Sequence, residues 1–262
     1  MTNLGGSYME RERRIREPFP VIFRNNLKLV PNVYDLERIG AGHDGIVFRL
    51  GDKALKVLKY NIEDRKEKGL MTFEKAAFFQ DEFEFNRIVQ PKDVLFNEDG
   101  IYTGYVMDYL EDVTTDKMKD SPVYKQPGDF TCGDLIQSVN ELSEDFNDMT
   151  KKKVVAKDLN RGSYIYTADF MHLCDMDKFL MNCYGAEDSN KKALNFAIAK
   201  HLYYEMLKTG TFDKQQLRQL SNWIKESSNS RTFIKKLTTE IGHEYTTPIK
   251  EYAKEKVKTI IR

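Results

Sequence analysis

The sequence changes character near residue 110, and this change constrains the fold more than any other feature. Before it, apolar runs rich in β-branched and aromatic residues are separated by glycine-containing turns, a pattern typical of antiparallel strands. After it, apolar residues recur at helical spacing in long segments. We therefore predict an α+β protein with a strand-rich first part and a mostly helical second part.

The first part predicts a five-stranded antiparallel sheet with one helix. Residues 33–60 read as a three-stranded meander, because a glycine loop and the tight turn Gly51-Asp52 separate its apolar runs. Residues 61–70 are charged and read as a loop, and residues 71–89 predict a single helix of about five turns. Pro91 ends this helix, and residues 93–96 and 101–110 predict two further strands around the turn 97–100.

The second part begins with a polar connection and is then dominated by helical spacing. Its first helix carries one apolar face, formed by Leu135, Val139, Leu142, Phe146 and Met149. Helices are predicted at 135–149, 191–210, 212–228, 231–242 and 248–262, and strand-like pieces at 153–159, 163–167 and 170–176.

These patterns predict three regions. Residues 1–33 form an N-terminal extension that is partly flexible, residues 34–110 a strand-rich lobe, and residues 111–262 a helical lobe. A cleft between two lobes is a usual place for a ligand.

Composition excludes several classes of protein. The 262 residues contain 41 basic and 41 acidic side chains, so no global charge favours nucleic acid or an anionic membrane. The three cysteines have no metal-ligand spacing, and no apolar run approaches the ~18 residues of a membrane helix. We expect a cytoplasmic protein, a monomer, that binds neither nucleic acid nor membrane.

The string Gly40-Ala41-Gly42-His43-Asp44-Gly45 is the first candidate for a binding site. Alone it is a weak signal, because such a string often marks only a turn. It lies between two strands, which disfavours a dinucleotide-binding βαβ unit. Eleven residues after Gly45, Lys56 lies within a largely apolar strand, where a cation needs an anionic partner.

Several sequence motifs, taken in their order along the chain, resemble those of eukaryotic-like protein kinases. "ERIGAGHDGIVFRL" resembles the glycine-rich loop, "ALKVL" the lysine strand, and "YTGYVMDYLED" the fifth strand and hinge. "MTKKKVVAKDLNRGSYIYTADFMHLCDMDKF" aligns without gaps on the catalytic loop and metal motif. The resemblance covers roughly residues 34–210, and the ordered set makes it specific.

The resemblance implies a two-lobed protein-kinase-like fold, ATP and Mg²⁺ as ligands, and a role for each matching residue. Asp158 would orient the attacking hydroxyl, and Lys56 would hold the phosphates and pair with a helix carboxylate. Glu82 is favoured as that carboxylate, with Asp81, Glu84 and Glu74 as alternatives. The implied nucleotide-binding residues are Gly40, Ala41, Gly42, Gly45, Val47, Lys56, Met107, Asp108 and Leu110, with Met107 as gatekeeper, and the implied metal ligands are Asp175, Ser163 and Asn160.

The chain departs from the family pattern in the catalytic loop. Ala156 and Lys157 replace the histidine and arginine before the catalytic aspartate. Ser163 stands where the family has a metal-binding asparagine, and Asn160 where a lysine is usual. After the metal motif Asp175-Met176-Asp177, whose second carboxylate is either a further metal ligand or an exposed loop residue, only about twenty residues precede the central helix. In that helix Asn195 replaces the usual aspartate.

Three functions follow as expectations. The first is transfer of the γ-phosphate of ATP to serine or threonine hydroxyls of a protein substrate. The second is a pseudokinase, which binds nucleotide and acts through a regulatory partner. The third is a small-molecule phosphotransferase of the same fold, which the serine at position 163 disfavours.

Overall fold

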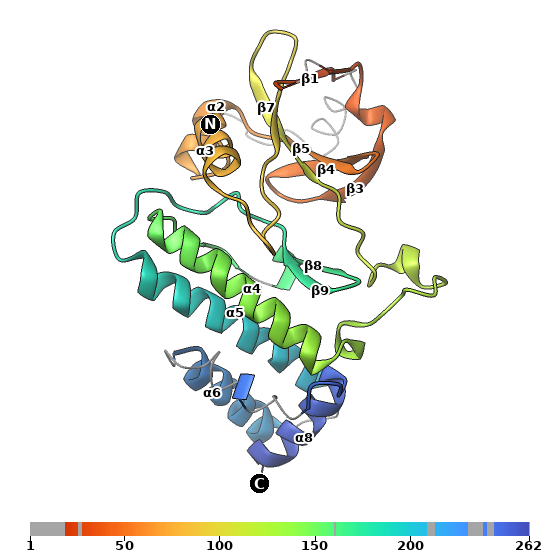
Figure 1. The fold of residues 1–262 in the computed structure, drawn as a ribbon, viewed down its shortest axis with the longest axis vertical. Coiled ribbons are helices and arrows are strands. Elements are labelled where there is room, and N and C mark those ends of the chain that lie inside the picture. The colour runs from red at the N-terminus through yellow and green to blue at the C-terminus, as the bar shows by residue number, and fades with distance from the viewer. Residues whose placement is uncertain are drawn as a thin grey trace, which may run out of the picture. The chain divides into compact units, whose positions relative to one another are not determined.

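A computed structural model of the chain describes residues 19–25, 28–159, 161–208, 213–229, 238–239 and 244–261 (Figure 1). The chain divides into two compact units. The first comprises Met1–Glu82 and Gln90–Tyr109, and the second comprises Phe83–Val89 and Leu110–Arg262. The fold is α+β, as predicted from the sequence.

The first unit contains a seven-stranded antiparallel sheet with the strand order β2-β1-β6-β7-β5-β4-β3. Its strands are β1 (Val21–Phe23), β2 (Leu29–Val30), β3 (Glu37–Ala41), β4 (Gly45–Leu50), β5 (Lys53–Leu58), β6 (Asp93–Phe96) and β7 (Tyr102–Asp108). The prediction of five strands was therefore wrong by two. The additional strands lie in the predicted N-terminal extension, and with three and two residues they are too short to show an alternating pattern.

The predicted meander of residues 33–60 is confirmed. Strands β3, β4 and β5 pair in sequence order, and Gly51 turns the second hairpin with a φ of 62°. Strand β5 also pairs with β7, which continues the sheet toward β6 and β1. Gly100 closes the β6–β7 turn with a φ of 73°, a conformation that favours glycine.

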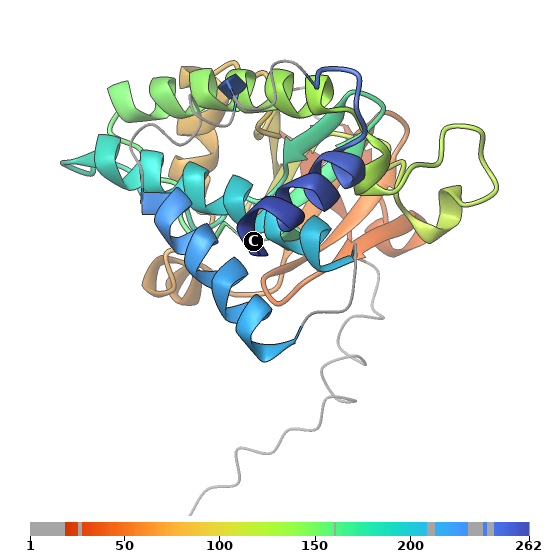
Figure 2. The ribbon, with the colours of Figure 1, turned by 90° about the horizontal axis from the view of Figure 1, so that it is seen from below.

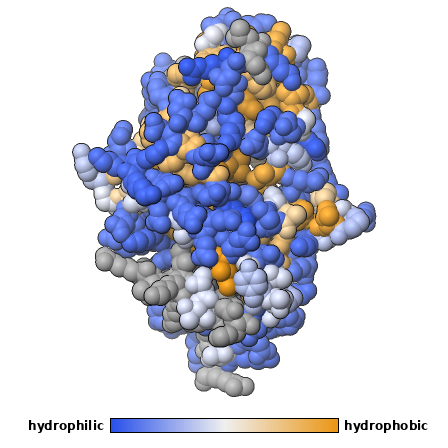
Figure 3. Space-filling view, in the orientation of Figure 1, coloured by the Kyte–Doolittle hydropathy of each residue, from blue (hydrophilic) through white to orange (hydrophobic). Residues whose placement is uncertain are grey.

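One face of this sheet carries the core of the first unit. The buried residues of the core are Val21, Phe23, Val30, Val33, Ile46, Phe48, Leu55, Val57, Leu95 and Val106. They come from six sheet strands and from the short 3-10 helix Val33–Asp35, so β1 and β2 contribute to the hydrophobic burial that stabilises the unit. In contrast, the molecular face drawn in Figure 3 is mainly hydrophilic, with apolar residues interspersed.

The helices of the first unit differ from the prediction. Residues 61–70 contain the short helix α2 (Ile62–Glu67), which Asn61 caps by accepting a hydrogen bond from the Asp64 N–H at 2.8 Å. Helix α3 (Phe73–Glu82) has ten residues, so the predicted five turns were wrong. Beyond α3, the N–H groups of Asn86 and Arg87 donate to the Asp145 carboxylate in helix α4 (Cys132–Lys151), so they are not part of a helical hydrogen-bond ladder.

The second unit is mostly helical, and α5 is central to it. The helices are α4 (Cys132–Lys151), α5 (Ala186–Lys208), α6 (Lys214–Asn229) and α8 (Ile249–Ile261). Helix α5 contacts α4, α6 and α8 (Figure 2). Four of the five predicted helices are thus found, and the predicted helix at 231–242 lies almost wholly outside the described residues.

Helix α4 shows how the sequence sets both an end and a face. Thr131 and Asp134 form a capping box, which places the start three residues before the predicted one. All five residues predicted to share its apolar face are buried. This agreement confirms the helical spacing read from the sequence.

Strands β8 (Tyr164–Thr167) and β9 (Phe170–Leu173) form an antiparallel hairpin in the second unit, as predicted from residues 163–167 and 170–176. Residues 153–159 do not form the predicted strand. Instead, Val155 makes an isolated antiparallel bridge to Leu180, with N···O distances of 2.8 and 2.9 Å. The loop that contains Asp158 is therefore not held along a strand ladder.

Within the described residues, no helix combines the length and the apolar character needed to cross a membrane.

Candidate functional site

The predicted phosphate-binding residues Gly40, Ala41, Gly42, Gly45 and Val47 lie in the β3–β4 hairpin of the first unit. The structural reason for a glycine differs among these positions. A Cβ at Gly45 would lie 2.8 Å from the Val57 carbonyl oxygen, so the sheet itself requires glycine there. A Cβ at Gly42 would meet nothing within 4 Å, and one at Gly40 only Val47 at 3.7 Å. The packing of the chain therefore does not explain Gly40 and Gly42, whereas close approach of a ligand to the backbone would.

Lys56 lies on one face of the sheet together with other predicted nucleotide-binding residues. It is directly opposite Val47 on β4 and Tyr105 on β7, and directly opposite residues of an antiparallel pair project to the same face. Met107 belongs to this face as well, through its pairing with Ala54. The core residues Leu55 and Val57 alternate with Lys56 and point to the opposite face.

The Lys56 side chain runs close to the glycine hairpin. Its Cγ and Cε would lie 3.4 and 3.5 Å from a Cβ at Gly45, and its Nζ lies 5.8 Å from the centroid of the Tyr105 ring. The glycine at position 45 thus makes room for the lysine stem. The first unit therefore places the Lys56 cation close to the β3–β4 hairpin. Packing within the unit does not explain the other two glycines of this hairpin, Gly40 and Gly42.

The predicted hinge residues follow at the end of β7. Met107 is buried, and the half-buried Asp108 accepts a hydrogen bond from Lys53 Nζ at 2.6 Å. The Tyr109 N–H donates to the Asp52 carbonyl at 2.9 Å, so the first unit already uses this group. Leu110 begins the second unit and is half-buried.

The helix carboxylates proposed as partners of Lys56 have clear positions. Glu82 is the exposed last residue of α3, next to Asp81, and Glu74 lies in the first turn of the same helix. Glu84 follows α3 and belongs to the second unit. Which carboxylate pairs with Lys56 stays a prediction.

Asp158 lies on a loop of the second unit in an unusual backbone conformation. Its φ is 61°, in the left-handed region that residues with a Cβ rarely adopt. Its Oδ2 accepts a hydrogen bond from Lys178 Nζ at 2.6 Å, and the two side chains keep 56 and 44% of their surface exposed. The loop thus presents a carboxylate with a cation beside it, close to water. Sequence reasoning missed Lys178, because no motif marks a pair separated by twenty residues.

Asn190, near the start of α5, anchors the loop that contains Asp158. Its Oδ1 accepts a hydrogen bond from the Ala156 N–H at 2.9 Å, and its Nδ2 donates to the Val154 carbonyl and the Thr150 hydroxyl, each at 2.9 Å. The side chain is buried, so these bonds are shielded from water. Sequence reasoning also missed Asn190 and considered Asn195 for α5 instead. The only signal was an asparagine at the start of a helix.

The predicted metal ligands belong to the second unit. Ser163 is buried, and its Oγ donates to the Asp158 carbonyl at 3.4 Å, while its own carbonyl accepts from the Cys174 N–H at 2.7 Å. Asp175 is exposed and follows β9 closely; Asp177 is buried, contrary to the exposed-loop alternative. Asn160 lies outside the described residues. No group of three or more His, Cys, Asp or Glu side chains in the described part of the chain is arranged to hold a metal.

A depression of about 350 Å³ lies beside Asp158 in the second unit. Its lining comes from the loop and from one face of α5: Val155, Ala156, Lys157, Asp158, Leu159, Ser189, Lys192, Ala193 and Phe196. The volume is at the lower end of the range for ligand pockets. The predicted catalytic residue therefore borders a concave surface.

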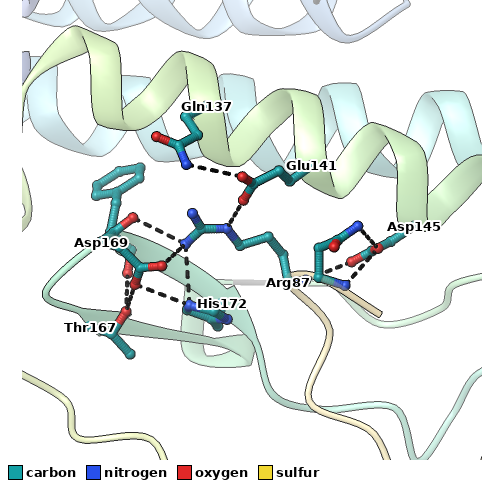
Figure 4. Close-up of polar contacts among 9 residues, drawn as sticks. Arg87, Gln137, Glu141, Asp145, Thr167, Asp169 and His172 are labelled. Atoms are coloured by element: carbon teal, nitrogen blue, oxygen red, sulfur yellow. Dashed lines mark hydrogen bonds and ion pairs between the residues drawn. The ribbon is translucent and has the colours of Figure 1, made fainter. Parts of the chain in front are cut away.

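A second cluster of charges surrounds Arg87 (Figure 4). Only 3% of the Arg87 side chain is exposed, and it forms ion pairs with Glu141 of α4 and with Asp169 at 3.0 Å. Its Nη1 also lies 3.2 Å from His172 Nε2 on β9. Asp145 of α4 accepts the backbone N–H groups of Asn86 and Arg87 at 2.9 and 2.8 Å. This cluster ties segment 83–89 and the β8–β9 hairpin to α4.

The pKa values of the Arg87 cluster follow from burial and pairing. Burial acts to raise the pKa of Glu141. Hydrogen bonds from Gln137 and Arg87 lower this pKa by more than burial raises it, so the pKa of Glu141 is below its usual value. Burial raises the pKa of Asp145, although the backbone donors oppose this. Burial lowers the pKa of His172, which therefore favours the neutral ring in the folded protein.

Comparison with known proteins adds no assignment to this geometry. No family model matches the chain, and no curated protein matches it.

Proposed function

We propose that this chain is an ATP-dependent protein kinase of the two-lobed protein-kinase-like fold, which transfers the γ-phosphate to serine or threonine hydroxyls. The ordered motifs from Gly40 to Asp175 support the proposal. The shared face of Val47, Lys56 and Met107 supports it as well.

The observation that carries the proposal is the conformation of Asp158. A non-glycine residue with a φ of 61° costs about 1 kcal/mol or more, and such strain concentrates at functional sites. The Asp158 side chain is more than half exposed, so its ion pair with Lys178 contributes little to folding. A charged residue that is exposed and held in a strained backbone conformation is well explained by chemistry.

Each residue has a role in the proposed transfer. Lys56 neutralises phosphate charge, and Gly40 and Gly42 let the backbone approach the phosphates. The Asp158 carboxylate orients the acceptor hydroxyl and accepts its proton. Asp175 and Asp177 offer the carboxylate oxygens that Mg²⁺ prefers, and the ion, when bound, neutralises charge on the phosphates.

Lys178 completes this set as a cation beside the catalytic carboxylate. The family lysine of the catalytic loop is replaced by Asn160, and Lys178 brings an ammonium group 2.6 Å from Asp158 by another route. A cation at this place stabilises the charge on the phosphoryl group during transfer. Lys178→Met is expected to lower kcat more than it raises the KM for ATP.

The test is transfer of labelled γ-phosphate from ATP with Mg²⁺ to a generic protein or to the chain itself. We expect transfer by the wild type and its loss in Asp158→Asn. A control, Asp148→Asn, changes an exposed carboxylate of α4 that pairs with Lys151 and should leave transfer unchanged. Absence of transfer by well-folded protein with Mg²⁺ and Mn²⁺ would contradict the proposal.

A pseudokinase is the second candidate, and the position of Ser163 favours it. This residue stands where the resemblance expects a metal ligand, yet it is buried and its hydroxyl donates to the loop backbone at 3.4 Å. A thermal-shift titration separates the two candidates. Stabilisation by Mg·ATP without transfer supports a pseudokinase, and at a hundredfold excess over Kd it amounts to roughly 2.7 kcal/mol.

The compartment that we propose is the cytoplasm. All three cysteines are free thiols, which supports a reducing compartment.

A further inference from the structure

The depression beside Asp158 has a distinct chemical character. Lys157 and Lys192 supply two cations, and Leu159, Ala193 and Phe196 supply apolar surface. Neither lysine forms an ion pair within the described part of the chain. The neighbouring Lys191, in contrast, pairs with Glu187. Two cations beside apolar surface fit a ligand that carries both an anionic and an apolar group.

The α5 side of the depression forms a continuous strip. Ser189, Lys192, Ala193 and Phe196 are spaced by three and four residues and therefore share one helix face. Phe196 has 42% of its surface exposed, which is unusual for a large aromatic residue. From Ser189 to Phe196 the strip is about 10 Å long, which corresponds to about three residues of extended peptide.

The strip remains accessible because the segment that connects Asp175 to α5 is short. Leu180 bridges to Val155, and the Cys183 N–H donates to the Lys153 carbonyl at 2.8 Å, so this connection runs beside the loop. Helix α5 then begins at Ala186. The strip opens onto the loop that carries Asp158.

We propose that this depression binds the acceptor of the reaction, and that the acceptor is an acidic peptide segment. Its target hydroxyl lies at Asp158, an acidic side chain lies at Lys157 and Lys192, and a bulky apolar side chain contacts Phe196, all within about three residues. This inference rests on the proposed function and adds the substrate class. A strip of this length and exposure suits an extended chain better than a small alcohol.

Binding of fluorescein-labelled peptides, measured by anisotropy, tests the inference without requiring catalysis. One peptide carries a serine that is followed by two aspartates and a phenylalanine, and a matched peptide carries lysines in place of the aspartates. The acidic peptide should bind more tightly. Lys157→Gln and Lys192→Gln should each weaken it by about two- to fivefold at low salt, as for exposed ion pairs.

The control variant is Lys191→Gln, which removes a neighbouring α5 lysine outside the lining and should leave peptide affinity unchanged. Phe196→Ala should also weaken binding, independently of salt. Equal binding of both peptides, or an equal effect of Lys191→Gln and Lys192→Gln, would overturn the inference. So would binding of D-glycerate, a small anionic alcohol, together with no binding of either peptide.

The outcome separates this inference from the proposed function. Lysine-dependent binding of the acidic peptide without phosphate transfer would refute the kinase activity and leave the binding site intact. Transfer to proteins regardless of acidic residues, with affinity unaffected by either lysine, would keep the kinase and refute the acceptor site.

Discussion

The second unit contains two charge clusters that differ in burial and in the number of elements that they link. Arg87 is 3% exposed and has partners on α4 and on the β8–β9 hairpin. Asp158 and Lys178 are 56 and 44% exposed, and each lies on a loop. The buried cluster links segment 83–89 and the β8–β9 hairpin to α4, whereas the exposed pair links two loop residues at the surface.

The difference separates structural from functional charge. A buried guanidinium is tolerated only when its donors are satisfied, so the partners of Arg87 are required by the fold itself. The Asp158 pair is accessible to water, and its aspartate adopts a left-handed backbone conformation. Residues that lower the stability of the fold and contribute few stabilising contacts are candidates for function.

The largest effect is expected from breaking the buried cluster. Arg87→Met leaves Glu141 and Asp169 without their cation, and we expect a loss of about 3 kcal/mol in the free energy of unfolding. This is the low end for buried pairs, because 60% of Asp169 is exposed. Urea denaturation measures the loss. Lys151→Met, which removes an exposed pair with Asp148, should cost less than about 1 kcal/mol; equal costs would contradict the distinction.

Loss of the loop anchor comes next. Asn190→Ala removes the partners of the Ala156 N–H and the Val154 carbonyl, and we expect about 1–3 kcal/mol less stability. Transfer by the folded enzyme should fall as well, because the anchored backbone leads directly to Asp158. Asn195→Ala, on the same helix, serves as the comparison. If it lowers kcat more than Asn190→Ala does, Asn190 is not the positioning residue.

The glycine hairpin allows the same distinction in the first unit. Gly45→Ala places a Cβ 2.8 Å from the Val57 carbonyl and should destabilise by about 1–3 kcal/mol. Gly42→Ala meets open space, so Tm should stay near that of the wild type while the stabilisation by Mg·ATP decreases. Thermal unfolding with and without nucleotide measures both effects. An undiminished nucleotide shift in Gly42→Ala would argue against contact of this glycine with phosphate.

The smallest effect concerns pH. Burial lowers the pKa of His172 in the folded state, so the unfolded chain binds more protons as the pH falls through about 6.5. The stability that depends on a neutral His172 is complete above that pH and is lost below it. Arg87, Glu141 and Asp169 face the ring, and Arg87 also disfavours its charged form. Urea titrations between pH 7.5 and 5.5 should show a shallower decrease for His172→Gln than for the wild type.

The sequence predicted what depends on local pattern. The hairpin strands β3 to β7 and the apolar face of α4 follow from spacing and turn residues. Strands β1 and β2 were missed because they are too short for alternation. The end of α3 was missed because it depends on Asp145, 59 residues from Asn86. Local pattern cannot report such a partner.

The candidate site shows the same division. Asp158 and Asp175 were selected from the order of motifs, and that order is readable in sequence. Lys178 and Asn190 were missed, because their contacts span 20 and 34 residues and involve no motif. Their importance depends on where the backbone turns, which only the structure gives.

The most direct test of the account measures two properties of Asp158→Asn together. Asparagine keeps the shape of the side chain and tolerates the left-handed conformation. We predict a free energy of unfolding within about 0.5 kcal/mol of the wild type, together with a loss of γ-phosphate transfer of at least about a hundredfold. Retained transfer, or a collapse of stability like that of Arg87→Met, would contradict the claim that this exposed charge serves chemistry and not the fold.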